Sequence, residues 1–291
     1  MSDELSRRRG IVGWSVFFLI FVVLTALTQI GGIVYIVSSI LVALVLGDRD
    51  RNRIVRWFVH LCVFSAIYLA VTLVAMPPIA REFDRYPLPC FASKARPYGA
   101  LNPGFCLLNR HYAVMGVHRM LDGLARALNK AHPGTVVVYL DAGFPMLDGF
   151  PVPPHLSHDS GSNIDIALFY RDKRGKYLPG RARSPIGYLG YEQPRAGDPD
   201  PCRGKPYLWV TRWQLGFVQD LWPSRPLEPT RTAAMVRWLA EDGRKFGVEK
   251  LFLEPYLVKR LAVPASPLIR FQGCRTARHD DHVHVQIQSG R

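Results

Sequence analysis

Two long uncharged apolar segments in the N-terminal quarter of the chain constrain its fold more strongly than any other feature. No charged side chain occurs in residues 11–46, and residues 57–76 are again uncharged apart from His60. A helix needs roughly 20 apolar residues to cross about 30 Å of hydrocarbon. Both segments therefore predict membrane-spanning helices.

The first segment is too long for a single crossing. Its roughly 36 residues, at about 1.5 Å each, would form a helix of about 54 Å. We expect a hairpin that turns within residues 28–32, because the paired Gly31 and Gly32 break a helix and let two helices approach closely. Its second half, residues 33–46, is short for a span. Residues 1–76 are thus expected to form three transmembrane helices, with two as the alternative.

The charges that flank these segments predict the topology. Arginines precede the first segment and fill the connector before the last one: Arg7, Arg8, Arg9, Arg49, Arg51, Arg53 and Arg56. Because cytoplasmic flanks carry the excess of basic residues, a hairpin places both clusters in the cytoplasm and sends the chain after residue 76 to the outside. A cleaved signal peptide is the alternative. It is disfavoured because no small-residue cleavage site follows and a further span does.

The cysteines also fit an external domain. One of the five, Cys62, lies in a predicted span, and the others follow it: Cys90, Cys106, Cys202 and Cys274. In an oxidising compartment four cysteines can form two disulfides in three connectivities. We favour Cys90 with Cys106 because they are close in sequence, and Cys202 with Cys274 by elimination. Four free thiols would instead fit a cytoplasmic domain.

The formal net charge of +14 is compatible with an anionic partner, although a solvated basic surface is enough to account for it. Basic residues near a membrane suit anionic lipid, and on an external domain they suit an anionic polymer such as cell wall. No arginine-rich tract interleaved with aromatic residues occurs, so a nucleic-acid partner is not expected. The lipid bilayer remains the expected partner of the N-terminal region.

The part after the membrane region divides into two. Residues 77–110 are rich in proline, glycine and aromatic residues, which indicates a linker or a disulfide-pinned strap. Residues 111–291 form the predicted domain, with helices over 111–130 and 230–246 and strands over 135–140, 163–170, 250–253 and 281–288. Helices and short strands without repeated crossovers predict an α+β domain, with a small, largely antiparallel sheet and flanking helices. The polar segment 171–205 is an insertion with no predicted element.

Histidine and aspartate concentrate in two patches, HLSHDSGSNID at 155–165 and HDDHVHV at 279–285. On a strand, His282 and His284 point to the same face. A catalytic zinc site uses three nitrogen or oxygen ligands and leaves a fourth position open. His158, Asp165 and His284 can supply these three ligands if the two predicted strands are neighbours.

The remaining polar residues of the patches have other predicted roles. His282 would sit beside the metal, where it could accept a proton from a water molecule, and His279 could steady charge near the substrate. The predicted chemistry is hydrolysis. Nearby acidic residues are expected to orient ligand histidines or to be solvated: Asp159, Asp280 and Asp281. Asp141 and Glu254 each follow an apolar strand and could face the site, but they are expected to end these strands at the surface.

These two patches resemble the signatures of a known superfamily. HDSGSNID, with HVH near the C-terminus, is similar to the HxxGxxxD and HxH patterns of the zinc peptidases that include penicillin-insensitive murein endopeptidases, D-Ala-D-Ala carboxypeptidases and dipeptidases, and hedgehog signalling domains. The murein endopeptidases are the most similar, through an HxSH start at 155–158, an HDDHxHV end at 279–285 and the segment VRWLAEDGRKFGVEKLFLEP before it. The likeness covers residues 135–288.

The resemblance implies a role for each matching residue. It implies Zn²⁺ on His158, Asp165 and His284, a catalytic His282, and accessory roles for His279 and His155. Asn163 departs from the pattern, which tends to carry an acidic or small residue there, so substrate preference is open.

The resemblance also implies a function. The chain would be a membrane-anchored zinc metallopeptidase that hydrolyses peptide bonds in peptidoglycan stems or cross-links. Its domain would lie on the periplasmic or extracellular side of a bacterial cytoplasmic membrane. Two alternatives stay open: a carboxypeptidase or dipeptidase of the D-Ala-D-Ala type, and a non-catalytic zinc-containing wall-binding or receptor domain.

Overall fold

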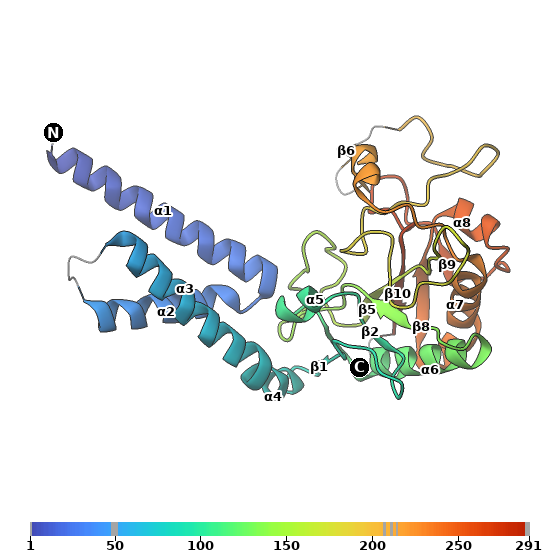
Figure 1. Cartoon of the computed structure of the whole chain (residues 1–291), viewed down its shortest axis with the longest axis horizontal. Coiled ribbons are helices and arrows are strands. Elements are labelled where there is room, and N and C mark those ends of the chain that lie inside the picture. The colour runs from blue at the N-terminus through green and yellow to red at the C-terminus, as the bar shows by residue number, and fades with distance from the viewer. Residues whose placement is uncertain (1, 48–51, 206–207, 210–211, 214, 289–291) are drawn as a thin grey trace.

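The N-terminal region of the structure, a computed structural model, consists of helices that lead into an α+β domain (Figure 1). The described residues are 2–47, 52–205, 208–209, 212–213 and 215–288. Helices α1 (Ser2–Thr28) and α2 (Gly31–Leu46) form an antiparallel hairpin. Its turn lies where the sequence predicts it. A Cβ on Gly31 or Gly32 would collide with side chains of α1, so the two glycines allow the helices to meet closely.

A single long helix, Arg53–Arg81, runs from the far end of the hairpin back to the domain. It comprises α3 (Arg53–Ala70), a π-helical turn (Val71–Ala75) and α4 (Met76–Arg81). Among the described residues only this helix is both long and apolar enough to cross a membrane. The apolar parts of the hairpin helices, Val12–Thr28 and Gly31–Leu46, are shorter.

The domain is built on one six-stranded sheet. Its strands, in spatial order, are β2 (Tyr98–Ala100), β4 (Val137–Tyr139), β5 (Asn163–Ala167), β10 (His282–Ile287), β8 (Val248–Phe252) and β9 (Ile269–Arg270). The α+β class is confirmed, but the sheet is mixed. The four central strands pair antiparallel, whereas both edge strands, β2 and β9, pair parallel. Neither edge strand is predicted from the sequence, because each has only two or three residues.

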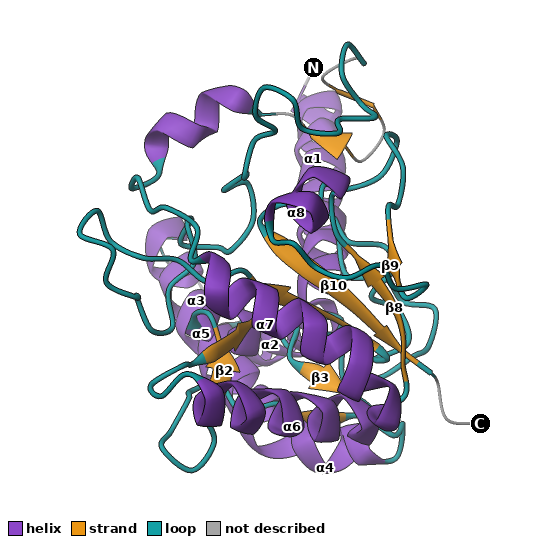
Figure 2. Cartoon of the chain, turned by 90° about the vertical axis from the view of Figure 1, so that its right-hand side faces the viewer, coloured by secondary structure: helices purple, strands orange, loops and turns teal. Residues whose placement is uncertain are grey.

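The two faces of the sheet differ in chemistry. Helices α6 (Met115–Ala131) and α7 (Pro229–Glu241) cover one face (Figure 2). The main core lies there and combines apolar residues of these helices and of the strands: Val117, Leu121, Leu124, Met235, Leu239, Ile164, Ile166, Val283 and Val285. Because strand side chains alternate, the intervening residues Asp165, His282 and His284 point to the opposite face. The predicted core and polar faces of these strands are therefore confirmed.

Helix boundaries differ from the predictions at two places. The helix predicted from residue 111 begins at Met115, because Tyr112 and Ala113 form strand β3, which pairs with β1 (Tyr86–Pro87). The helix predicted over 230–246 begins one residue earlier, at Pro229 of α7, and the Glu228 side chain caps it by accepting a hydrogen bond from the Arg231 amide. A short 3-10 turn, Asp242–Phe246, then ends at Gly247 with a left-handed φ of 87°.

The segment 77–110 is tied to the domain. It carries β1, β2 and the short helix α5 (Pro103–Leu107), and the disulfide between Cys90 and Cys106 closes it. The insertion 171–205 has no regular strand or helix in its described residues. After it come the hairpin of β6 (Leu208–Trp209) and β7 (Arg212–Trp213) and a 3-10 helix, Gly216–Leu221; α8 (Pro255–Arg260) follows β8.

Candidate metal centre

The register of the two central strands brings the sequence patches together. Strand β5 pairs antiparallel with β10, and His284 lies directly opposite Asp165. Side chains directly opposite each other in such a pair have Cβ atoms about 5 Å apart. The condition on which the predicted site depended, that the two strands are neighbours, is therefore confirmed.

His158 reaches the site from the loop that precedes β5. Its Nδ1 lies 2.7 Å from the carbonyl oxygen of Ala142, to which it donates. The glycine of the patch, Gly161, adopts a left-handed φ of 66°, and a Cβ there would approach Nε of Arg85 to 2.5 Å. The loop thus requires glycine at this position to turn into the strand.

The three predicted ligands converge. Nε2 of His158 lies 3.2 Å from Oδ1 of Asp165, and Nδ1 of His284 lies 2.8 Å from the same oxygen. The three ligand atoms all lie within 4.8 Å of one another. Ligands at about 2.1 Å from a tetrahedral zinc ion are roughly 3.4 Å apart, so the group matches the size of such a site.

The surroundings of His158 favour a positive charge. Its Nδ1 donates to a carbonyl, so Nε2 is the ring nitrogen that faces Oδ1 of Asp165, and this buried atom has no hydrogen-bond partner. Burial opposes protonation of His158, yet the Asp165 carboxylate raises its pKa. Burial opposes ionisation of Asp165, yet the imidazoles of His158 and His282 hold its pKa well below the usual 3.8. Two nitrogens and one carboxylate oxygen form a donor set that suits zinc.

His282 lies beside these ligands and is oriented by an aspartate. Its Nδ1 is 2.6 Å from Oδ1 of Asp281, and its Nε2 is 3.6 Å from Oδ2 of Asp165. Burial opposes protonation, but Asp165 and Asp281 raise the pKa of His282 to about 9. Asp280 is different. It is fully buried and binds Arg278 and the Tyr256 hydroxyl, away from the histidines.

His279 closes the other side of the histidine cluster. Its ring centroid lies 5.0 Å from that of His282 and 5.8 Å from that of His284. Burial, together with these two imidazoles, holds the pKa of His279 well below 6.5. Its backbone amide donates to Oε1 of Glu254 at 3.4 Å. Glu254 is only 1% exposed, so the expectation that it ends a strand at the surface is wrong.

A second histidine–aspartate pair flanks the site. Nδ1 of His155 lies 2.9 Å from Oδ2 of Asp141, and the Arg110 guanidinium binds both oxygens of this carboxylate, at 2.6 and 2.8 Å. Burial opposes ionisation of Asp141, yet the His155 hydrogen bond and the Arg110 charge lower its pKa. Asp141 is 1% exposed. The prediction that it ends a strand at the surface is therefore also wrong, because the insertion covers the end of β4.

Tyr188, from the insertion, is a site residue that the sequence alone does not indicate. Its hydroxyl donates to Oδ2 of Asp165 at 2.8 Å and accepts from the Asp141 amide at 3.1 Å. Its ring lies 4.3 Å from that of His155 and 5.1 Å from that of His282, between centroids. No local pattern marks this tyrosine, since its role depends on contacts with residues far along the chain.

Other groups of metal-type side chains are already engaged. Asp141, His155 and Asp165 also converge, but the Arg110 guanidinium and the His155 hydrogen bond already neutralise Asp141. The sulfurs of Cys90 and Cys106, which lie near His111, are bonded to each other. Among the described residues, the group at His158 is thus the one whose donor atoms suit a metal ion.

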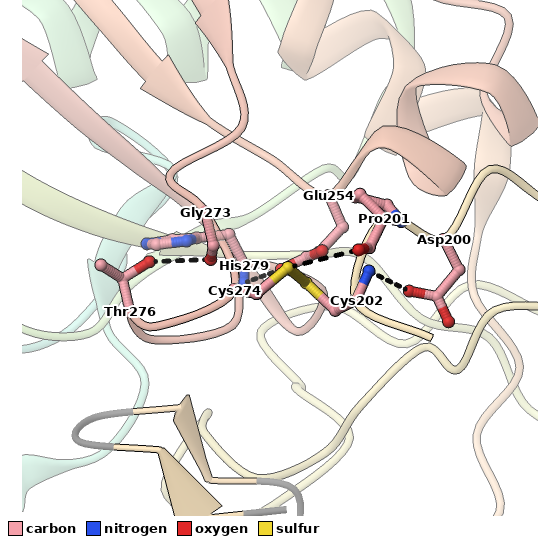
Figure 3. Close-up of a disulfide and its surroundings, with 8 residues drawn as sticks. All are labelled: Asp200, Pro201, Cys202, Glu254, Gly273, Cys274, Thr276 and His279. Carbon is pink, nitrogen blue, oxygen red and sulfur yellow. Dashed lines mark hydrogen bonds between the residues drawn. A yellow bond between two sulfur atoms is a disulfide. The ribbon is translucent and has the colours of Figure 1, made fainter. Parts of the chain in front are cut away.

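Both predicted disulfides are confirmed: Cys90 with Cys106 and Cys202 with Cys274. The second joins the insertion to the loop before β10, and Figure 3 shows it beside Glu254 and His279. That loop supplies Gln272, Thr276 and Ala277 to a cleft of about 190 Å³ that is also lined by the three candidate ligands. The disulfide therefore fixes one wall of the cleft.

A larger apolar cleft adjoins the first. It has a volume of about 460 Å³ and lies between α5 and residues 186–189 of the insertion. Pro154 and His155 border both clefts, while Arg110 and Asp141 form the polar end of the larger one. An extended molecule bound in the first cleft, which is lined by His158, Asp165 and His284, could therefore continue into the larger cleft toward α5.

Comparison with known proteins adds no assignment. No family model matches the chain, and no curated protein sequence matches it.

Proposed function

We propose that the chain is a membrane-anchored zinc metallopeptidase that hydrolyses peptide bonds in the peptide stems or cross-links of peptidoglycan. The observation that carries this proposal is the convergence of His158, Asp165 and His284, with His282 beside them and a cleft above them. The resemblance of the two histidine patches to murein endopeptidases supplies the substrate class.

The residues of the site have distinct roles in this proposal. A zinc ion bound by His158, Asp165 and His284 would act as a Lewis acid on the peptide carbonyl and make water more acidic. His282 accepts the proton of the attacking water and returns it to the departing amine. Asp281 holds its Nδ1, so that Nε2 faces the reaction. A bound cation would oppose the effect of Asp165 and lower the pKa of His282 toward neutrality, where imidazole acts as a base.

We also propose that the helical region lies in a bacterial cytoplasmic membrane, with the domain on its outer side. The start of α1, the end of α2 and the start of α3 lie at the same end of the helices, away from the domain (Figure 1). Residues 7–9 of α1 and Arg53 and Arg56 of α3 belong to this end of the helices, which supports a cytoplasmic location by the positive-inside rule. The two disulfides suit an oxidising compartment.

Alanine variants separate metal binding from proton transfer. We expect His158→Ala, Asp165→Ala and His284→Ala each to lose zinc and activity, because each removes a ligand. His282→Ala should keep the metal and lose about 10²- to 10⁴-fold in turnover, the usual contribution of a general base. Zinc content is measured by mass spectrometry of the purified full chain, and turnover by release of wall fragments with and without a chelator.

His132→Ala is the matched control, because this histidine lies at the end of α6, outside the group of His158, Asp165 and His284. This variant should change neither the zinc content nor the turnover. Equal zinc loss in all four site variants would show that His282 is a ligand. A chain that binds zinc tightly but cuts neither cross-linked wall peptides nor D-Ala-D-Ala peptides would be a binding domain instead.

A further inference from the structure

The hairpin helices are shorter than a bilayer is thick. Helix α2 has 16 residues and the apolar part of α1 about 17, which at about 1.5 Å each gives roughly 24–26 Å. The hydrocarbon core measures about 30 Å. Helix Arg53–Arg81, with 29 residues, is about 44 Å long and continues past the hairpin turn. Tilting the hairpin would reduce its reach further.

The domain sits directly on the tip of the hairpin. The Gln29 side chain donates to the Met146 carbonyl at 2.8 Å and accepts from the Met146 amide at 2.9 Å. The Tyr68 hydroxyl donates to the carbonyl of Leu107 in α5 at 2.7 Å. Ile30 is buried at the same junction. The domain surface near Leu107 and Met146 is therefore level with the ends of the short helices.

The position of this level along the helix Arg53–Arg81 places it inside the hydrocarbon. Tyr68 follows Trp57, the first residue after the arginine flank, by about 11 residues, or roughly 17 Å. A slab of about 30 Å that starts at Trp57 ends near Met76. Domain atoms beside residues 68–76 would therefore lie in the outer leaflet.

Exposed apolar side chains occur at this level on both the helix and the domain. Four exposed side chains surround the junction: Leu73 (65% exposed), Val74 (73%), Leu107 (44%) and Leu147 (53%). We call these four residues the collar. Charged side chains border the collar. These are Arg81 and Glu82 on the helix, and Asp148, which pairs with Arg85. The collar is thus continuous with the exposed apolar faces of the helices and ends where charge begins.

We propose that the collar is immersed among the acyl chains of the outer leaflet, so that the domain is partly embedded in the membrane. This inference rests on the membrane location proposed above. Helix α5, which carries Leu107, also forms a wall of the larger cleft that ends at Asp141 and His155. The embedded collar would therefore hold this cleft at the membrane surface, within reach of substrates that are themselves attached to the membrane.

Spin labels can test the depth of the collar. The full chain, with Cys62→Ser to remove its free thiol, receives one of Leu107→Cys, Leu147→Cys, Val74→Cys or Leu221→Cys. The labelled proteins are placed in vesicles of phosphatidylethanolamine and phosphatidylglycerol. Collisions with oxygen, which concentrates in hydrocarbon, are compared with collisions with a water-soluble nickel complex. Leu221 is the matched control, because it is 68% exposed in the 3-10 helix Gly216–Leu221, outside the collar.

We expect oxygen to dominate at positions 74, 107 and 147 and nickel to dominate at 221. Nickel dominance at 107 and 147 with oxygen dominance at 74 would overturn the collar and leave the anchor intact. Nickel dominance at 74 as well would overturn the membrane location itself. A second measurement uses the unmodified chain: a lipid with a photoreactive group in its acyl chain should label peptides that contain Leu107 and Leu147, and absence of this labelling would count against the proposal.

Discussion

At the scale of single residues, neighbouring side chains orient the candidate metal group, which consists of His158, Asp165 and His284. Asp165 presents Oδ1 to His158 and His284, while its Oδ2 accepts from Tyr188. Asp281 orients His282. Such outer partners fix the orientation of ligands, and their loss commonly reduces metal affinity or activity by about 10- to 100-fold. The insertion that carries Tyr188 is therefore part of the site.

Tyr188→Phe tests this role. The change removes one hydroxyl and keeps the ring between His155 and His282, so we expect turnover or zinc affinity to fall by about 10- to 100-fold. Stability should fall by about 2 kcal/mol, because the hydroxyl hydrogen-bonds both Asp165 and the Asp141 amide. Tyr177→Phe is the control in the same insertion, because its hydroxyl contacts the Val136 backbone rather than Asp165. Unchanged turnover and zinc affinity in Tyr188→Phe would contradict the role.

At the scale of elements, the turn between α1 and α2 forms a specific contact with a loop of the domain. Gln29 has a left-handed φ of 67°, is buried, and pairs its side-chain amide with both backbone groups of Met146. The loop 143–154 that contains Met146 leads directly to His155. The hairpin therefore stabilises a loop that borders the metal group.

Gln29→Gly removes this contact without straining the turn, since glycine accepts a positive φ. We expect the loop to open more readily. With two hydrogen bonds lost, each worth about 1 kcal/mol, amides in residues 144–150 should exchange with solvent roughly 10- to 30-fold faster. Ile33→Ala, an exposed position in the same hairpin, should leave exchange in this loop unchanged. Equal exchange in both variants would show that Gln29 does not hold the loop.

At the scale of the whole molecule, the helices and the domain form two parts with opposite chemistry. The helices expose apolar side chains along most of their length, whereas the domain buries its apolar residues between the sheet and α6 and α7. Large exposed apolar surfaces on a stable protein indicate a partner. A bilayer fits the length and composition of Arg53–Arg81.

A reporter fusion tests the resulting topology in cells. A reporter that works only outside the cytoplasm should be active when fused after Met76, and inactive when fused within the connector before Trp57. The physical reason is that the arginines of the connector are retained in the cytoplasm. Activity of the connector fusion, or inactivity of the fusion after Met76, would reverse the proposed orientation.

The sequence by itself determined the features that depend on local spacing. The alternation of Asp165 with Ile164 and Ile166, and of His282 with Val283, defined which strand faces are polar. Gly31 and Gly32 marked the hairpin turn. The metal group could be predicted because its members lie within two short patches, and strand geometry then fixes where each side chain points.

Only the tertiary structure decided which distant segments meet. It brought Tyr188 and Asp141 to Asp165, buried Glu254 beside His279, added two parallel edge strands, and set Gln29 against Met146. None of these contacts has a local signal, because the periodicity of a helix or strand defines the direction of a side chain but not its partner. That partner is selected when distant segments pack together.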